Sequence, residues 1–185
     1  MTAGCLVAGC TGGGEPAPSP PVETSAEPSV TEAPEPEPTT TGPPKPERPA
    51  AMDRDDAEGA AAAAEYFLEL YPYVMSTGDT AEWDAMTWAE TCDFCTSVSS
   101  EARSIRDKGD AFSGAEITLS NANVGAFDDL IGGYPILFDF DQSPHRRVAP
   151  DGNVVSDDDG ESGQLQIDML EKDGNWLVLA VGGSD

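Results

Sequence analysis

The chain has 185 residues and a formal net charge of −26 at pH 7, of which −21 falls after residue 50. Nucleic acids and anionic lipid headgroups attract basic proteins, so we expect no nucleic-acid partner and no electrostatic attachment to a membrane. Cationic, neutral or metal-bearing partners remain, as does a charged surface that only keeps the protein soluble. No apolar run approaches the ~18 residues that a membrane-spanning helix requires.

The N-terminal segment Val7-Ala8-Gly9-Cys10 has the pattern of a bacterial lipobox, in which the cysteine becomes the lipidated first residue of the mature protein. We therefore interpret residues 1–10 as the remnant of a lipoprotein signal peptide. The alternative is a chance cysteine in an Ala/Gly-rich stretch. Residues 1–9 lack the basic and apolar segments of a complete signal, so we expect the natural chain to begin further upstream.

Residues 11–50 are rich in Pro, Glu and Thr and carry almost no large apolar side chains. Proline fixes the backbone and removes a donor, which favours extended structure. Such a segment cannot bury enough apolar surface to fold by itself. We predict a disordered tether of at most ~120 Å, at about 3.1 Å per residue.

Apolar periodicity begins after the tether, and it is helical first. A helix is predicted to start at Asp53 or Asp55 and to kink or end at Pro72, with Gly78 as the last stop. A short helix follows the capping-box spacing of residues 79–82, and a third runs from about Thr91 to Gly109. Their predicted buried residues are Ala60, Ala63, Ala64, Phe67, Tyr71, Val74, Trp83, Met86, Phe94, Val98, Ala102 and Ile105.

From residue 114 onward, apolar and polar residues alternate, which predicts antiparallel strands with one exposed face. We expect strands at 115–120, 136–141, 164–169 and 176–181, the last two joined by a turn at 173–174. Residues 143–162 are polar and are expected to loop, with room for a short strand near Val148 or Val154. Helices followed by such strands predict an α+β domain over residues 51–185, with the helices packed on a curved antiparallel sheet.

The pair Cys92 and Cys95 is the most specific local motif. We favour a structural disulfide formed outside the reducing cytoplasm. A redox dithiol normally lies in a βαβ setting, and a zinc site needs about four ligands, whereas this chain has one histidine. Both remain as alternatives.

Three weaker candidates are more simply explained as solvent-exposed residues. The acidic stretch 151–161 has oxygen ligands for calcium but lacks the spacing of an EF-hand loop. His145 lies between polar residues with no nucleophile placed beside it. Asp139 and Asp141 share one strand face and could act as paired carboxylates, although any exposed sheet face shows such alternation. We therefore expect no metal, no cofactor and no catalytic residue.

The helix-then-sheet order resembles the nuclear transport factor 2-like α+β cone, also called cystatin-like. More specifically, residues 76–80 followed by Cys92-Asp93-Phe94-Cys95 resemble an actinobacterial lipoprotein family of unknown function, whose members join a lipobox and a Pro/Thr/Glu-rich tether to one such domain. The resemblance covers residues 50–182. It implies a location in the cell envelope, on the outer face of the cell membrane, and no established activity.

Together these features predict a lipid-anchored, extracytoplasmic, non-catalytic module that binds an envelope protein or a small apolar ligand. The alternative is a small-molecule isomerase or dehydratase, which requires a pocket carboxylate of raised pKa. A homodimer through the exposed sheet face is a further expectation. A pocket inside the cone is predicted from the aromatics Phe67, Tyr71, Trp83, Phe138 and Trp176, which would otherwise be core.

Overall fold

A computed structural model describes residues 42–183 of the chain, so the predicted lipobox with Cys10 and residues 11–41 of the predicted tether lie outside the described residues. The helical elements are η1 (Ala50–Asp53), α1 (Ala57–Thr77), α2 (Ala81–Ala85) and α3 (Asp93–Lys108). The strands are β1 (Ala111–Gly114), β2 (Ile117–Val124), β3 (Gly133–Gln142), β4 (His145–Val148), β5 (Val154–Asp158), β6 (Glu161–Lys172) and β7 (Asn175–Gly183). Helices followed by antiparallel strands confirm the α+β prediction. Within residues 42–183, no helix is long and apolar enough to cross a membrane.

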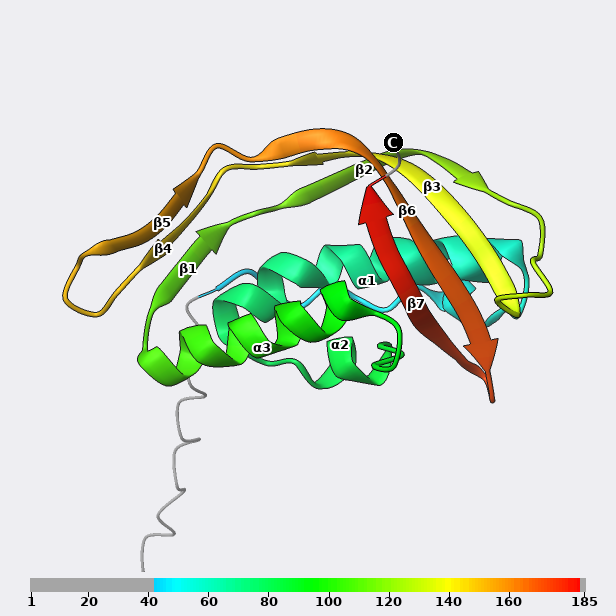
Figure 1. Cartoon of the computed structure of the whole chain (residues 1–185), viewed down its shortest axis with the longest axis horizontal. Coiled ribbons are helices and arrows are strands. Elements are labelled where there is room, and N and C mark those ends of the chain that lie inside the picture. The colour runs from blue at the N-terminus through cyan, green and yellow to red at the C-terminus, as the bar shows by residue number, and fades with distance from the viewer. Residues whose placement is uncertain (1–41, 184–185) are drawn as a thin grey trace, which may run out of the picture. The chain divides into compact units, whose positions relative to one another are not determined.

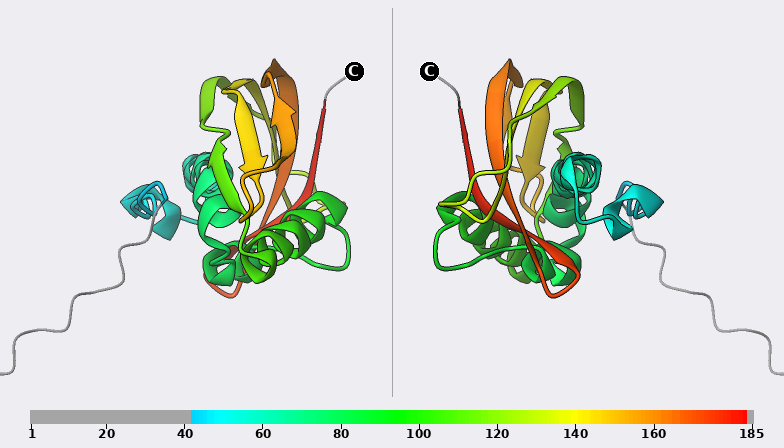
Figure 2. Two further views of the ribbon diagram at one scale, coloured as in Figure 1. Left: turned by 90° about the vertical axis from the view of Figure 1, so that its left-hand side faces the viewer. Right: turned by 90° about the vertical axis from the view of Figure 1, so that its right-hand side faces the viewer.

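The strands form two antiparallel sheets that continue into one another. The order is β2-β3-β6-β7 in the larger sheet and β1-β4-β5 in the smaller one. Figure 1 shows the strands arching over α1, with α3 beside it in the same helical layer, and Figure 2 shows that layer from both ends. The curvature gives the larger sheet an inward face, toward the helices, and an outward face toward solvent.

The two sheets meet at a bend in the chain, which occurs between β1 and β2, between β3 and β4, and between β5 and β6. Ala115 separates β1 from β2 with φ of 63°, and Gly160 separates β5 from β6 with φ of 81°. A Cβ atom at Gly160 would lie 2.2 Å from the carbonyl oxygen of Gln142, so only glycine fits there. Ser143 closes the bend between β3 and β4 by donating its backbone N–H to Glu116 O at 2.9 Å. The polar stretch predicted to loop therefore contains β4 and β5.

Helix α1 differs from the prediction at its start and at Pro72, and it ends at Gly78 as predicted. Its N-cap is Asp56, whose side chain accepts the backbone N–H groups of Glu58 and Gly59, and not Asp53 or Asp55. The helix continues through Pro72 to Thr77. Pro72 removes one backbone hydrogen bond, but it lies on the buried face, and packing along a 21-residue helix outweighs that loss.

Part of the stretch predicted as tether contacts the domain. The Lys45 ammonium forms an ion pair with Glu82, and the Arg48 guanidinium lies 2.8 Å from the Asp53 carboxylate. Met52, in η1, is 4% exposed and belongs to the core. Residues 42–53 therefore line the helical layer and bring the chain to the start of α1.

The core lies between α1 and the inward face of the larger sheet. Alternation along β3 and β6 points Ile136 and Phe138, with Leu165 and Ile167 opposite them, toward the helices. Trp83 from α2 is fully buried and stacks on Phe67 of α1, with ring centroids 3.9 Å apart. These contacts fill the middle of the domain.

Candidate functional site

A cleft of about 580 Å³ opens between the helical layer and the inward face of the larger sheet. One wall comes from α1 and the first turn of α3, and the other from the beginnings of β2 and β6 and the ends of β3 and β7. Small-molecule sites usually span about 300–1,000 Å³. The lining residues are Leu68, Tyr71, Phe94, Ile117, Phe140, Gln142, Glu161, Ser162, Gly163, Gln164, Leu165, Val181, Gly182 and Gly183.

The cleft exists because two positions on the inward sheet face are glycines. Alternation along β6 puts Glu161, Gly163 and Leu165 on the same face, and Gly183 of β7 pairs with Leu165. A Cβ atom at Gly163 would lie 3.5 Å from Phe140 Cε1, which is ordinary contact, and one at Gly183 would meet no described atom within 4 Å. There is therefore room for side chains at both positions, and the sequence leaves it empty.

The helical wall of the cleft is aromatic. The rings of Tyr71 and Phe94 lie 6.5 Å apart, centroid to centroid, with an angle of 17° between their planes. Phe94 was expected on the buried face of α3, but it is 38% exposed. It lies in the first turn, where the helix is beside the cleft and not over the core, so its ring faces the open space.

The charge in the cleft is negative. Glu161 is the one acidic residue of the lining, and no Lys, Arg or His of residues 42–183 contributes to it. Burial raises the pKa of the Tyr71 hydroxyl, and the carboxylates of Glu101, Asp158 and Glu161 raise this pKa further. Tyr71 is therefore a neutral phenol at neutral pH, in a negative potential.

Of the five aromatics predicted to form a pocket, Tyr71 alone lines the cleft. The other four are at most 3% exposed, because their rings fill the core. Both tryptophans also use their indole N–H groups structurally: Trp83 donates to the carbonyl oxygen of Cys95 at 2.9 Å, and Trp176 to that of Arg54 at 3.0 Å. Phe67 and Phe138 are both fully buried. Four of the five predicted aromatics are thus packed in the core, and Tyr71 lines the cleft together with Phe94.

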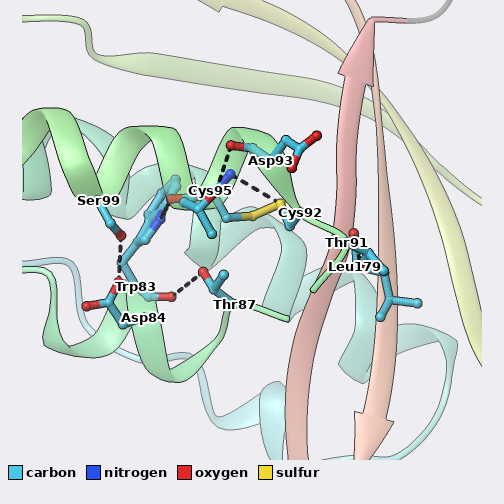
Figure 3. The surroundings of a disulfide bond; sticks show 10 residues. Trp83, Asp84, Thr87, Thr91, Cys92, Asp93, Cys95, Ser99 and Leu179 are labelled. Atoms are coloured by element: carbon cyan, nitrogen blue, oxygen red, sulfur yellow. Dashed lines mark hydrogen bonds between the residues drawn. A yellow bond between two sulfur atoms is a disulfide. The ribbon is translucent and has the colours of Figure 1, made fainter. Parts of the chain in front are cut away.

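A disulfide joins Cys92 to Cys95 at the start of α3 (Figure 3). Both side chains are buried, and Cys92 Sγ accepts the backbone N–H of Cys95 at 3.2 Å as the N-cap of the helix. Thr91, the residue before Cys92, donates its hydroxyl to the carbonyl oxygen of Leu179 in β7 at 2.7 Å. Redox chemistry needs an accessible sulfur, so this environment favours a structural role.

Apart from Glu161, the remaining candidates lie away from the cleft lining. Asp139 and Asp141 share the outward face of β3, where the side-chain amides of Asn121 and Gln164 donate to Asp139 at 2.6 and 2.7 Å and lower its pKa. The acidic stretch 151–161 forms the β4–β5 turn and β5, where a carboxylate oxygen of Asp158 lies 3.3 Å from His145 Nε2, and it ends at Glu161, which begins β6 and lines the cleft. In the described part, no three His, Cys, Asp or Glu residues are grouped to hold a metal ion.

Sequence reasoning did not assign Gly163, Gly183, Glu161 or Phe94 to a cleft, and it considered Glu161 only as a calcium ligand and Phe94 only as a core residue. One signal could have found two of them. Extending the alternation of Leu165, Ile167 and Met169 backward along the chain places Gly163 and Glu161 on the inward face, where a strand that packs a core would carry large apolar residues. Gly183 and Phe94 join the cleft only through tertiary structure.

Fold and cleft together define an α+β domain with a helical layer on a curved antiparallel sheet and an open, partly apolar cleft between them. The chain belongs to a family described as of unknown function, DUF6318, which it matches over residues 33–181. No curated protein matches it significantly.

Several solved structures resemble the domain. The intermembrane space region of the chloroplast protein ARC6 is 12% identical, covers 70% of this chain and 97% of its own, and has a TM-score of 0.44. An uncharacterised protein with a cystatin-like fold from Caulobacter vibrioides is 12% identical, covering 66% of this chain and 87% of its own, with a TM-score of 0.41. A protein titled Rd1NTF2_05 is 14% identical, covering 65% and 96%, with a TM-score of 0.34.

Proposed function

We propose that this protein is a lipid-anchored module on the outer face of the cell membrane, and that its domain binds a small ligand in the cleft. The observation that carries the binding function is the cleft itself: about 580 Å³ of space with aromatic and aliphatic walls and a few polar groups. Ligand sites of proteins have this composition. The lipobox at residues 7–10 and the Pro-rich segment after it support the location.

An enzymatic role has less support than ligand binding. The isomerase or dehydratase alternative requires a carboxyl group of raised pKa inside the pocket. Burial does raise the pKa of the Glu65 carboxyl, with a further contribution from Glu69, but neither residue of α1 lines the cleft. We therefore propose a binding module and not a catalyst.

Binding is tested with N-phenyl-1-naphthylamine, a neutral apolar dye that fluoresces when it leaves water. We expect saturable fluorescence with the full chain and its loss in Gly163→Val, whose side chain occupies the cleft. Gln166→Val, on the outward face of the same strand and outside the lining, is the control. Equal fluorescence of all three proteins would exclude the cleft as the binding site.

Anchoring is tested by separate means. With its natural leader, the protein is expected in the membrane fraction of its host, and Cys10→Ser is expected to abolish this. A protein that stays in the membrane fraction after this substitution would contradict lipidation at Cys10. A partner protein of the envelope and a homodimer through the sheet remain proposals, and sedimentation velocity distinguishes a monomer from a dimer.

A further inference from the structure

The cleft has a chemical bias that its volume and apolar walls do not explain. Three carboxylates, Glu101 from α3, Asp158 from β5 and Glu161 from β6, act on the hydroxyl of Tyr71. No basic side chain of the described residues lines the same space. A ligand that enters the cleft therefore meets negative potential from several elements at once.

Glu161 differs from the other two carboxylates in having no partner. Glu101 lies 3.6 Å from the Arg147 guanidinium, and Asp158 lies 3.3 Å from His145. Within residues 42–183, Glu161 takes part in no ion pair and accepts no side-chain hydrogen bond, and it is the carboxylate that lines the cleft. Its charge is available to a ligand.

The aromatic wall favours the same kind of ligand. The faces of aromatic rings carry negative electrostatic potential and attract cations within about 6 Å of the ring centroid. Tyr71 and Phe94 present two nearly parallel rings to the cleft. Leu68, Ile117 and Val181 supply aliphatic surface beside them, where a purely hydrophilic cation would lose its hydration without compensation.

We propose that the cleft selects a small organic cation with an apolar body, its charge held between Glu161 and the rings of Tyr71 and Phe94. An alkyl- or aryl-ammonium group has this chemistry. The proposal rests on the proposed function, since it names the class of ligand for the same cleft. It follows from the one unpaired carboxylate, the aromatic wall and the absence of basic lining residues in the described part.

The test compares two molecules of the same shape. Benzyldimethyl(2-hydroxyethyl)ammonium carries a quaternary nitrogen, and in its neutral isostere a quaternary carbon replaces that nitrogen. We expect the full chain to bind the cation about tenfold more tightly than the isostere in calorimetry at low salt, a preference that weakens as salt is added.

Three variants assign the preference. Glu161→Gln keeps the shape of the side chain and is expected to bring the two affinities to within about twofold, because the charge is gone. Asp141→Asn, on the outward face of β3 and paired in register with Ser162, removes one negative charge outside the cleft and is expected to keep the preference. Phe94→Leu keeps apolar surface and is expected to weaken cation binding more than isostere binding.

The outcomes separate this inference from the proposed function. Equal binding of both molecules to the full chain, lost in Gly163→Val, would overturn the cation proposal and leave the cleft a ligand site. A preference that survives Glu161→Gln would overturn the role of Glu161. Binding of neither molecule, or binding that Gly163→Val does not change, would overturn both proposals.

Discussion

Two neighbouring regions between the helices and the sheet have similar composition and opposite packing. Trp83 is fully buried, and the fully buried ring of Phe67 stacks on it with centroids 3.9 Å apart. On the other side, the ring centroid of Phe94 lies 6.1 Å from that of Trp83, and Phe94 lines a cleft of about 580 Å³. The difference lies in the sheet, whose inward face carries the fully buried ring of Phe138 in the core and only Gly163 at the cleft. An apolar wall borders an open cleft where the facing side chain is missing.

The largest expected change in stability comes from a substitution in the packed region. Trp83→Ala removes a fully buried ring and its hydrogen bond to Cys95, and should lower the free energy of unfolding by about 3–5 kcal/mol. Phe94→Ala, at a 38% exposed ring, should cost about 1 kcal/mol or less. Chemical denaturation measures both. Equal losses of stability would mean that the two aromatic side chains are packed alike, which would contradict the difference between the packed region and the cleft.

Removing the disulfide should have the next largest effect. The double substitution Cys92→Ala and Cys95→Ala opens a short loop and removes the cap of α3, for an expected loss of about 2 kcal/mol. Ligand binding should remain, because neither sulfur lines the cleft. If dithiothreitol at neutral pH changed ligand affinity without changing stability, the structural role of this disulfide would be contradicted.

Filling the cleft should change function and leave stability nearly unchanged. Gly163→Val adds a β-branched side chain to a paired strand, at a position where Cβ contacts Phe140 at an ordinary 3.5 Å. The free energy of unfolding should stay within about 1 kcal/mol of the unsubstituted protein, and dye binding should be lost. Gly163→Ala should weaken binding only in part. A strongly destabilised Gly163→Val would mean that no free space lies above this strand.

The smallest effect is at the start of α1, away from both regions. The hydrogen bond from the Arg54 side chain, then the backbone N–H of Gly59, and then the positive charge of Arg54 lower the pKa of Asp56 from 3.8 to about 2. A lowered pKa adds stability above pH 3.8 that disappears as the pH falls toward 2. Asp56→Asn keeps the cap but not the charge, so its midpoint of thermal unfolding should lie slightly below that of the unsubstituted protein at pH 6, and the two should converge near pH 2. A constant difference would contradict the linkage.

Sequence patterns predicted most of the fold because periodicity reports directly which side of an element is buried. The buried alternation of Leu165, Ile167 and Met169 and the helical stripe through Phe67 both hold in the structure. For β4 and β5 the sequence predicted no more than one short strand near Val148 or Val154, because this hairpin is mostly polar and no apolar alternation marks its strands. The helix does not end at Pro72, because local propensity is weaker than the packing of a long helix.

The cleft could be predicted only in part, for a physical reason. Sequence identifies large apolar side chains, and a cleft is defined by where they are missing. Tyr71 was selected for its size and spacing, as were Trp83 and Phe138. Nothing in those patterns separates the ring of Tyr71, which lines the cleft, from the two rings that are packed in the core. The distinction depends on what faces each ring across the layer, which only the strand register of β6 with β3 and β7 determines.

The most direct test of the cleft as a ligand site is an amide ¹H–¹⁵N correlation spectrum during titration with the neutral isostere. We predict saturable shifts that centre on Tyr71, Phe94, Gly163 and Gly183, and their loss in Gly163→Val. Leu130, 93% exposed in the β2–β3 loop, is the rival apolar surface. Shifts centred on that loop, or no saturable shifts at all, would contradict the account.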